Sequence, residues 1–78
     1  MAAKAFVLIE TAVGRTKEVV AKAAQIKGVK SADPVTGPYD IIVVIEGESH
    51  NELGNLVTTK VHGISGITRT VTCLVTSL

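Results

Sequence analysis

The chain has 78 residues, of which 46% are hydrophobic and only 3% aromatic, and its formal net charge is +1 at pH 7. This length predicts one domain over residues 1–78 with a small core, because a domain of this size buries only about 60% of its unfolded surface. The near-neutral charge argues against direct binding to nucleic acid, and the longest apolar run, residues 41–45, is too short to span a membrane.

Residues 5–9 are continuously apolar, which is typical of a strand that is buried on both faces. Apolar residues then recur at helical spacing from Thr16 to Lys27, and Gly28 is a typical helix stop. Residues 29–33 form a more polar extended segment before Pro34, which suits an edge strand. The first half of the chain therefore predicts a strand, a helix and a second strand.

The second half repeats this pattern. A turn at residues 36–38 leads into a strand over residues 39–46, and so short a connection predicts an antiparallel hairpin. A capping box at residues 49–52 opens a helix that continues to Val61, and the last strand covers residues 67–78. The order βαββαβ predicts an α+β, ferredoxin-like sandwich, in which two helices cover one face of a four-stranded antiparallel sheet.

Two helices cover only one face of such a sheet, yet two of the predicted strands are apolar on both faces. Residues 5–9 and 41–45 contain no polar side chain at any position. The face without helices must therefore meet another subunit, and a two-fold partner that stacks sheet on sheet is the commonest solution. We predict at least a homodimer, which also supplements the small core.

Residues suited to enzyme chemistry are scarce. His50 and His62 flank the second helix without sharing one of its faces, so we expect surface residues and no metal site. Cys73 is the single cysteine, which excludes an internal disulfide; with no signal-peptide pattern at the N-terminus, it predicts a cytoplasmic protein. We expect Cys73 to be a buried residue on the helix-facing side of the last strand. No catalytic residue and no cofactor is predicted.

One corner of the chain and one strand together indicate a small-molecule site. A zwitterionic amino acid needs an acceptor for its ammonium group, donors for its carboxylate and a wall for its side chain. Asp40 is the predicted acceptor. The predicted donors are the Gly37 N–H and the hydroxyls of Thr70 and Thr72, and Tyr39 forms part of the wall. The structural alternative is a turn whose Asp bonds its own backbone, beside threonines that simply suit a strand.

These residues resemble the stand-alone effector-binding (RAM) domain of the Lrp/AsnC, or feast/famine, transcriptional regulators. The Gly-Pro-Tyr-Asp corner at residues 37–40 and the segment 66–72 carry the resemblance, and the βαββαβ order extends it over the chain. It implies a non-enzymatic sensing and oligomerisation module, with dimers that assemble into octameric or decameric rings and amino acids that bind between dimers. The ligand-binding residues that it implies are Gly37, Tyr39, Asp40, Thr70 and Thr72.

The resemblance also bears on partners. Full-length members carry an N-terminal DNA-binding domain, whereas this chain begins directly at the first strand, so we expect no DNA-binding domain here. A full-length regulator that joins a mixed ring is one candidate partner. Pro38 departs from the pattern because proline offers no backbone N–H, so affinity or ligand choice could differ from that of relatives.

Two other functions fit the same fold, and fold alone does not decide between functions. A dimeric α+β barrel enzyme, such as a small monooxygenase, shares the sheet-on-sheet dimer. However, the chain has no Trp, a single Phe and no His on a predicted strand. An ACT-like module also binds amino acids between subunits, but the Gly-x-aromatic-Asp corner fits that module less well.

Overall fold

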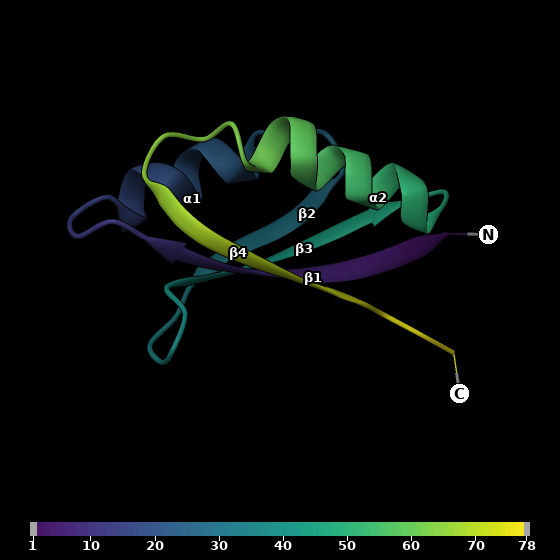
Figure 1. Cartoon of the computed structure of the whole chain (residues 1–78), viewed down its shortest axis with the longest axis horizontal. Helices are drawn as coiled ribbons and strands as arrows, with labels where there is room; N and C mark the ends of the chain where they lie inside the picture. Colours follow the sequence, from purple (N-terminus) through teal and green to yellow (C-terminus); the bar gives the residue numbers. More distant parts are fainter. Residues whose placement is uncertain (1, 78) are drawn as a thin grey trace.

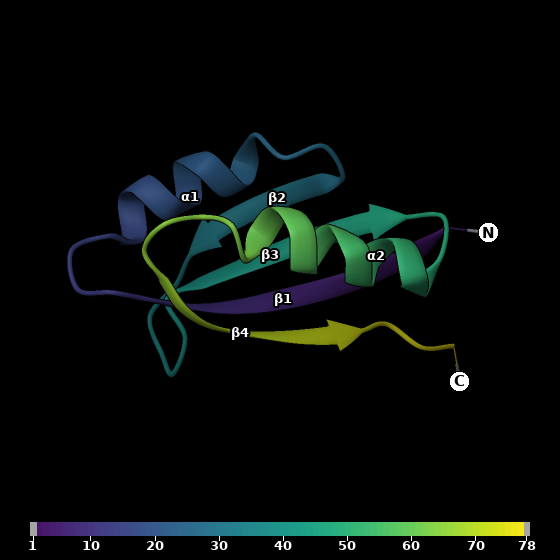
Figure 2. The same cartoon turned by 45° about the horizontal axis from the view of Figure 1, so that its top comes forward.

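A four-stranded antiparallel sheet carries both helices on one face (Figures 1 and 2). The computed structural model describes residues 2–77, and the strand order is β2-β3-β1-β4. The predicted βαββαβ order and ferredoxin-like sheet are confirmed. The elements are β1 (Ala3–Thr11), α1 (Thr16–Ala24), β2 (Val29–Pro34), β3 (Ile41–Gly47), α2 (His50–Leu56), the π-helix η1 (Val57–Val61) and β4 (Ile67–Leu74).

The ends of several elements differ from the prediction. β1 extends beyond residues 5–9 at both ends, and β3 begins at Ile41, so Tyr39 and Asp40 belong to the preceding loop and not to the predicted strand. α1 stops at Ala24 because the chain tightens into shorter-range bonds, from the Gln25 N–H to the Lys22 carbonyl and from the Ile26 N–H to the Ala23 carbonyl. β4 ends at Leu74, and the predicted extension reaches Leu78, which lies outside the described residues. Within residues 2–77, no helix has the length and apolar character needed to cross a membrane.

The core lies between the helices and one face of the two central strands. Alternate residues of β1 and β3 are fully buried there: Ala5, Val7, Ile9, Ile41, Val43 and Ile45. Both helices cover them with small or branched side chains: Val19, Ala23, Leu53, Val57 and Val61. The two-residue period of a strand thus assigns one half of each apolar run to the core and the other half to the opposite face.

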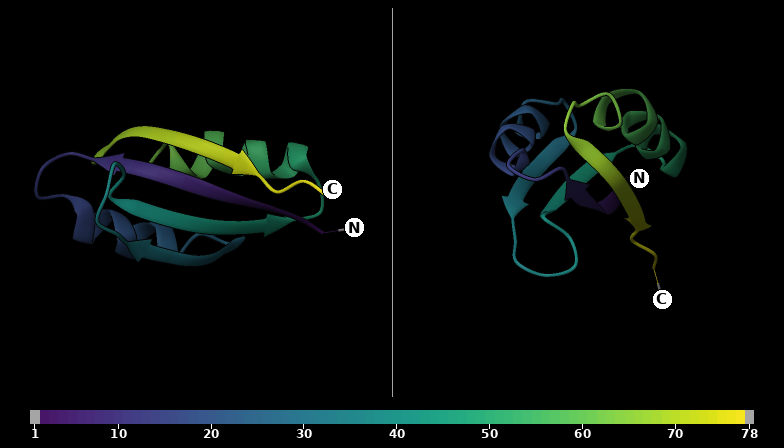
Figure 3. Two further views of the ribbon diagram at one scale, coloured as in Figure 1. Left: turned by 90° about the horizontal axis from the view of Figure 1, so that it is seen from below. Right: turned by 60° about the vertical axis from the view of Figure 1, so that its left-hand side comes forward.

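That opposite face carries no helix, and the view from below shows all four strands without a cover (Figure 3). Phe6, Leu8, Ile42 and Val44 lie on it and remain partly exposed, with Phe6 at 37%. We call these four residues the open apolar face. The Lys4 ammonium group lies 5.5 Å from the centre of the Phe6 ring. The prediction that both central strands are apolar on both faces is confirmed.

Cys73 lies on the open side of the sheet, so its predicted position on the helix-facing side was wrong. β4 pairs with β1 so that Cys73 is opposite Phe6, while Thr72 is opposite the core residue Val7. The prediction assumed that the more apolar row of β4 would face the helices. Pairing with β1 decides otherwise, and Val71 and Cys73 extend the open apolar face to the edge of the sheet, where Cys73 is exposed.

The second helix changes from α to π geometry at Val57, which the sequence analysis did not predict. Its buried residues, Leu53, Val57 and Val61, are spaced at intervals of four. In an α-helix, four residues overshoot a full turn by about 40°, so successive side chains drift away from the sheet. The wider π turn keeps them in line, and its bond from the His62 N–H to the Val57 carbonyl measures 2.9 Å.

Candidate functional site

Asp40 joins the β2–β3 loop to the end of β1. Its N–H donates to the Ile9 carbonyl at 2.9 Å, and its carbonyl accepts the Val35 N–H at 2.8 Å, which closes the loop of residues 35–40. Its side-chain Oδ2 accepts the Thr11 N–H at 2.8 Å and the Thr11 hydroxyl at 3.3 Å. Asp40 therefore fixes the backbone of a neighbouring strand, whereas the structural alternative had it bond within its own turn.

The second carboxylate oxygen of Asp40, Oδ1, makes no such contact among the described residues. Both side-chain hydrogen bonds of Asp40 within residues 2–77 go to Oδ2, which leaves Oδ1 without a donor there. A carboxylate has about four lone-pair sites, so Oδ1 retains the capacity to accept from a cationic group. Oδ2 therefore holds the sheet together, whereas Oδ1 accepts no hydrogen bond within residues 2–77.

The rest of the corner is exposed or half-buried. Gly37 adopts a φ of +151°, which residues with a Cβ rarely adopt, and no atom lies within 4 Å of the position that a Cβ would take. Pro38 is exposed, and Tyr39 is half-buried. The glycine therefore keeps a backbone amide at the surface of the loop, beside the single tyrosine of the chain.

β4 approaches the same end of the sheet from the other side of β1. Ile9 pairs with Ile41 of β3 and with Thr70 of β4, so Asp40 and Thr70 flank the same segment of β1. Two strand spacings separate them, about 10 Å. Thr72 follows two positions along β4, farther from the corner, and is exposed. The structure thus brings Asp40 and Thr70 to one end of the sheet and leaves Thr72 at its margin.

His62 contacts this group, although the sequence analysis treated it as an isolated surface residue. Its Nε2 lies 2.6 Å from the Thr70 hydroxyl. The signal in the sequence is the short connection of residues 63–66, which folds the chain back from η1 into β4. Because the connection is so short, His62, which precedes it, lies beside β4, which follows it. His50 lies at the other end of the second helix, where it is exposed.

Arg15 supplies a positive charge near the beginning of β4. Its guanidinium forms an ion pair with Glu18 at 2.7 Å and donates to the Ser65 hydroxyl at 3.0 Å. The hydrogen bond from Arg15 lowers the pKa of the Glu18 carboxyl, and the reciprocal contact raises the pKa of Arg15. This is the one ion pair within residues 2–77. The hydrogen bond from Arg15 to Ser65 joins the start of α1 to the connection that precedes β4.

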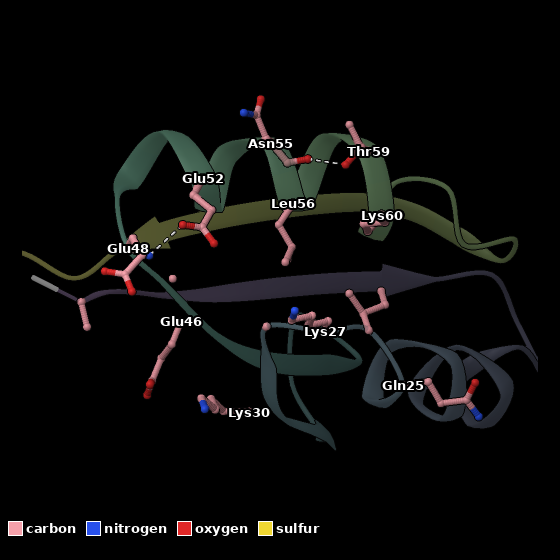
Figure 4. A pocket seen from close by; sticks show the side chains of 14 residues that line it. Gln25, Lys27, Lys30, Glu46, Glu48, Glu52, Asn55, Leu56, Thr59 and Lys60 are labelled. Atoms are coloured by element: carbon pink, nitrogen blue, oxygen red, sulfur yellow. Dashed lines mark hydrogen bonds between the residues drawn. The ribbon is translucent and has the colours of Figure 1, made fainter.

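A cleft at the opposite end of the sheet contains none of the predicted site residues. It has a volume of about 990 Å³ and lies between α2 and the connection from α1 to β2, with Leu56 directed into it (Figure 4). The charged residues that line it are three lysines and three glutamates: Lys27, Lys30, Lys60, Glu46, Glu48 and Glu52. A smaller hollow of about 590 Å³, beside residues 2–4 and 75–77, also excludes the five predicted residues.

The five predicted site residues are all exposed or half-buried. Gly37, Tyr39, Asp40, Thr70 and Thr72 line neither hollow. Across residues 2–77, no three side chains of His, Cys, Asp or Glu are grouped closely enough to hold a metal ion.

The sequence model of the Lrp/AsnC ligand binding domain matches residues 4–78. The chain belongs to this family. The resemblance found in the sequence is thereby confirmed, and as a member of this family the chain is a ligand-sensing regulatory module of the type that transcription regulators contain. A comparison with curated proteins found no match.

Three solved structures illustrate the similarity. A hypothetical protein from Pyrococcus horikoshii, PHS023, is 33% identical, with a TM-score of 0.88 over 100% of this chain and 93% of that one. TTHA0845 from Thermus thermophilus is 30% identical, with a TM-score of 0.91 over 97% of this chain and 95% of that one. Both chains therefore match this chain over nearly their whole length.

The third structure is a complex of the transcriptional regulator NMB0573 from Neisseria meningitidis with L-Met. It is 17% identical to this chain, with a TM-score of 0.84 over 96% of this chain and 50% of that one. At this identity the similarity establishes a shared fold alone. The fold of the Lrp/AsnC ligand-binding domain thus occurs as about half of a larger regulator.

Proposed function

We propose that this chain senses a free amino acid without catalysing a reaction and couples that binding to the assembly of identical subunits. The observation that carries the proposal is the divided role of Asp40, whose Oδ2 holds β1 while Oδ1 has no donor within residues 2–77. Thr70 lies across β1 from it, at the same end of the sheet. An acceptor for an ammonium group and a hydroxyl for a carboxylate then lie at one end of the sheet.

The proposed ligand spans this surface. Its ammonium group donates to Asp40 Oδ1, and its carboxylate accepts from the Thr70 hydroxyl, with the Thr72 hydroxyl and the Gly37 N–H as further donors. Tyr39 provides part of a wall. Charge-assisted bonds at both ends of the ligand supply the specificity for a zwitterion.

We further propose that the ligand lies between dimers, in rings of the octameric or decameric type that the family resemblance implies. Two observations support this. The five residues lie outside the two hollows described above, and in the proposed ring a neighbouring subunit excludes water from them. The open apolar face offers a separate surface for the dimer itself. The L-Met complex of NMB0573 supports an amino acid as the ligand class. A full-length regulator in a mixed ring is the proposed receiver of the signal.

A ligand shifts assembly only by its differential affinity for the two assembly states. Tenfold tighter binding to the ring than to the free dimer favours the ring by about 1.4 kcal/mol for each bound ligand. The test is a calorimetric titration with each of the twenty amino acids, with sedimentation equilibrium in parallel. We expect heat and a change in average mass with at least one of them. An absence of heat with all twenty, together with unchanged mass, contradicts the proposal.

A further inference from the structure

His62 is joined to the proposed site by a single short contact. Its Nε2 atom lies 2.6 Å from the Oγ1 atom of Thr70, and Thr70 is the hydroxyl assigned to the ligand carboxylate. His62 is exposed, and Thr70 is half-buried. Within residues 2–77, Thr70 is the one side-chain hydrogen-bond partner of the imidazole.

The π-helix positions His62 at this point. The His62 N–H bonds the Val57 carbonyl across the π turn, and the Ile64 N–H bonds the Val61 carbonyl directly after it. The helix before this turn is fixed as well, because the hydroxyls of Thr58 and Thr59 each donate to a carbonyl of the preceding turn, at 2.9 and 2.6 Å. The backbone of His62 is therefore held on both sides, and π turns recur at functional sites.

The protonation state of the imidazole determines what Thr70 offers to a ligand. When Nε2 carries no hydrogen, it accepts the Thr70 hydroxyl hydrogen, and Thr70 presents only lone pairs to the ligand. The imidazolium carries hydrogens on both nitrogens, so its Nε2 donates to Thr70. The Thr70 hydroxyl hydrogen is then free to donate to a carboxylate. Protonation also brings a positive charge close to that carboxylate.

We infer that His62 is a positioning residue of the amino-acid site, which acts through Thr70 and makes ligand binding stronger when His62 is protonated. This inference rests on the proposed function of the same surface. Histidine is the side chain that ordinarily changes its charge between pH 5 and 8, so the effect falls within a physiological range.

In the described part of the chain, the other charged residues near His62 do not contact the Thr70 hydroxyl. Lys60 lies on the same π-helix, and no hydrogen bond joins it to Thr70. The connection of residues 63–66 is uncharged. On β4, Arg69 lies on the opposite side of the sheet from Thr70, and Arg15 of α1 is engaged by Glu18. His62 is thus the histidine in contact with Thr70.

The experiment uses isotope-labelled protein and an equimolar mixture of the protein amino acids without histidine and cysteine, whose side chains titrate near this range. Amide chemical shifts report the half-saturating concentration at about pH 5.5 and about pH 8. We expect binding of the wild-type protein to be roughly tenfold tighter at the lower pH, as a charge-assisted donor replaces an acceptor. His62→Gln should bind equally at both pH values. His50→Gln is the matched control at the other end of the second helix and should keep the pH dependence.

Equal wild-type affinities at the two pH values overturn the role of His62, as does a pH dependence that survives in His62→Gln. Binding itself is intact in both of those cases, so the proposed function stands. An absence of any shift at both pH values overturns the proposed function, and this inference with it. A measurement without ligand checks the contact: Thr70→Val should change the nitrogen chemical shifts of the His62 imidazole and leave those of His50 unchanged. Unchanged His62 shifts in Thr70→Val also overturn the inference.

Discussion

Asp40 accepts the backbone N–H of Thr11 through one carboxylate oxygen at 2.8 Å, while its other oxygen has no donor within residues 2–77. The same side chain therefore closes the sheet at the end of β1 and offers a negative charge at the surface. A substitution that removes the whole side chain disturbs both properties. Separating them requires a pair of variants.

Asp40→Asn and Asp40→Ala form that pair. Asn retains a side-chain oxygen for the Thr11 N–H but loses the charge, so we expect stability within about 1 kcal/mol of wild type and amino-acid binding at least roughly tenfold weaker. Ala leaves the Thr11 N–H without its acceptor and should cost a further 1–3 kcal/mol, roughly. Urea denaturation and calorimetric titration measure the two effects. Full affinity in Asp40→Asn would refute the ligand role of the carboxylate.

Adjacent valines of β3 test the open apolar face. Val43 is fully buried beneath the helices, whereas Val44 lies on the open side and is partly exposed. An aspartate at position 43 would bury an unpaired charge, which lowers the free energy of unfolding by several kcal/mol by order of magnitude. Val43→Asp should therefore unfold the chain. Val44→Asp should keep the helical circular dichroism of wild type but sediment as a monomer. A dimeric Val44→Asp protein at micromolar concentration argues against the open face as the dimer contact.

Much of this fold could be predicted because strand and helix periods are recorded directly in the apolar pattern. That residues 5–9 and 41–45 are apolar on both faces of their strands could be predicted without knowing which strands pair. The face on which Cys73 lies could not be predicted without the strand pairing. Both faces of β4 carry polar and apolar side chains, and only the pairing with Phe6 and Val7 of β1 shows which face is covered by the helices. The register shift between Glu10 and Thr11 is likewise a property of paired strands and leaves no local pattern.

The sequence named candidate site residues, and their role in ligand binding stays a prediction, but it did not indicate the contacts that those residues make. The Asp40 corner and Thr70 were identified from ligand chemistry, and the structure brings them to the same end of the sheet. The bond from Asp40 to Thr11 spans 29 positions, so no local pattern could indicate it. The contact between His62 and Thr70 depends on a π turn that follows from four-residue spacing of buried side chains, which ordinary helical periodicity overlooks.

Gly66 is predicted to be essential for the start of β4. Its φ is +104°, and an added Cβ would lie 3.1 Å from side-chain atoms of both Arg15 and Val19. Gly66→Ala should therefore destabilise the fold by about 1–3 kcal/mol, measured by urea denaturation. Gly54→Ala is the matched control, because Gly54 is helical and an added Cβ there would have no atom within 4 Å. That variant should gain up to about 1 kcal/mol. Equal stabilities of the two variants would show that the Gly66 backbone is not constrained.

The Arg15–Glu18 pair predicts a small dependence of stability on acid pH. The hydrogen bond from Arg15 lowers the folded-state pKa of Glu18 below its unfolded value of 4.5. The contribution is therefore fully present above that value and is lost as the pH falls through the folded-state pKa. Urea midpoints measured from pH 7 downward should decline less steeply in Glu18→Gln than in wild type. Both groups are solvent-exposed, so the difference should be small. A steeper decline in Glu18→Gln contradicts the predicted sign.

The most direct test of the proposed sensor is amide chemical-shift mapping of the deuterated wild-type protein with an equimolar mixture of the twenty amino acids. We predict saturable shifts at Gly37, Tyr39 and Asp40 together with Thr70 and Thr72, at one end of the sheet. An absence of shifts, or shifts confined to the cleft between α2 and the α1–β2 connection at the opposite end, would contradict the assignment of this surface as the ligand site.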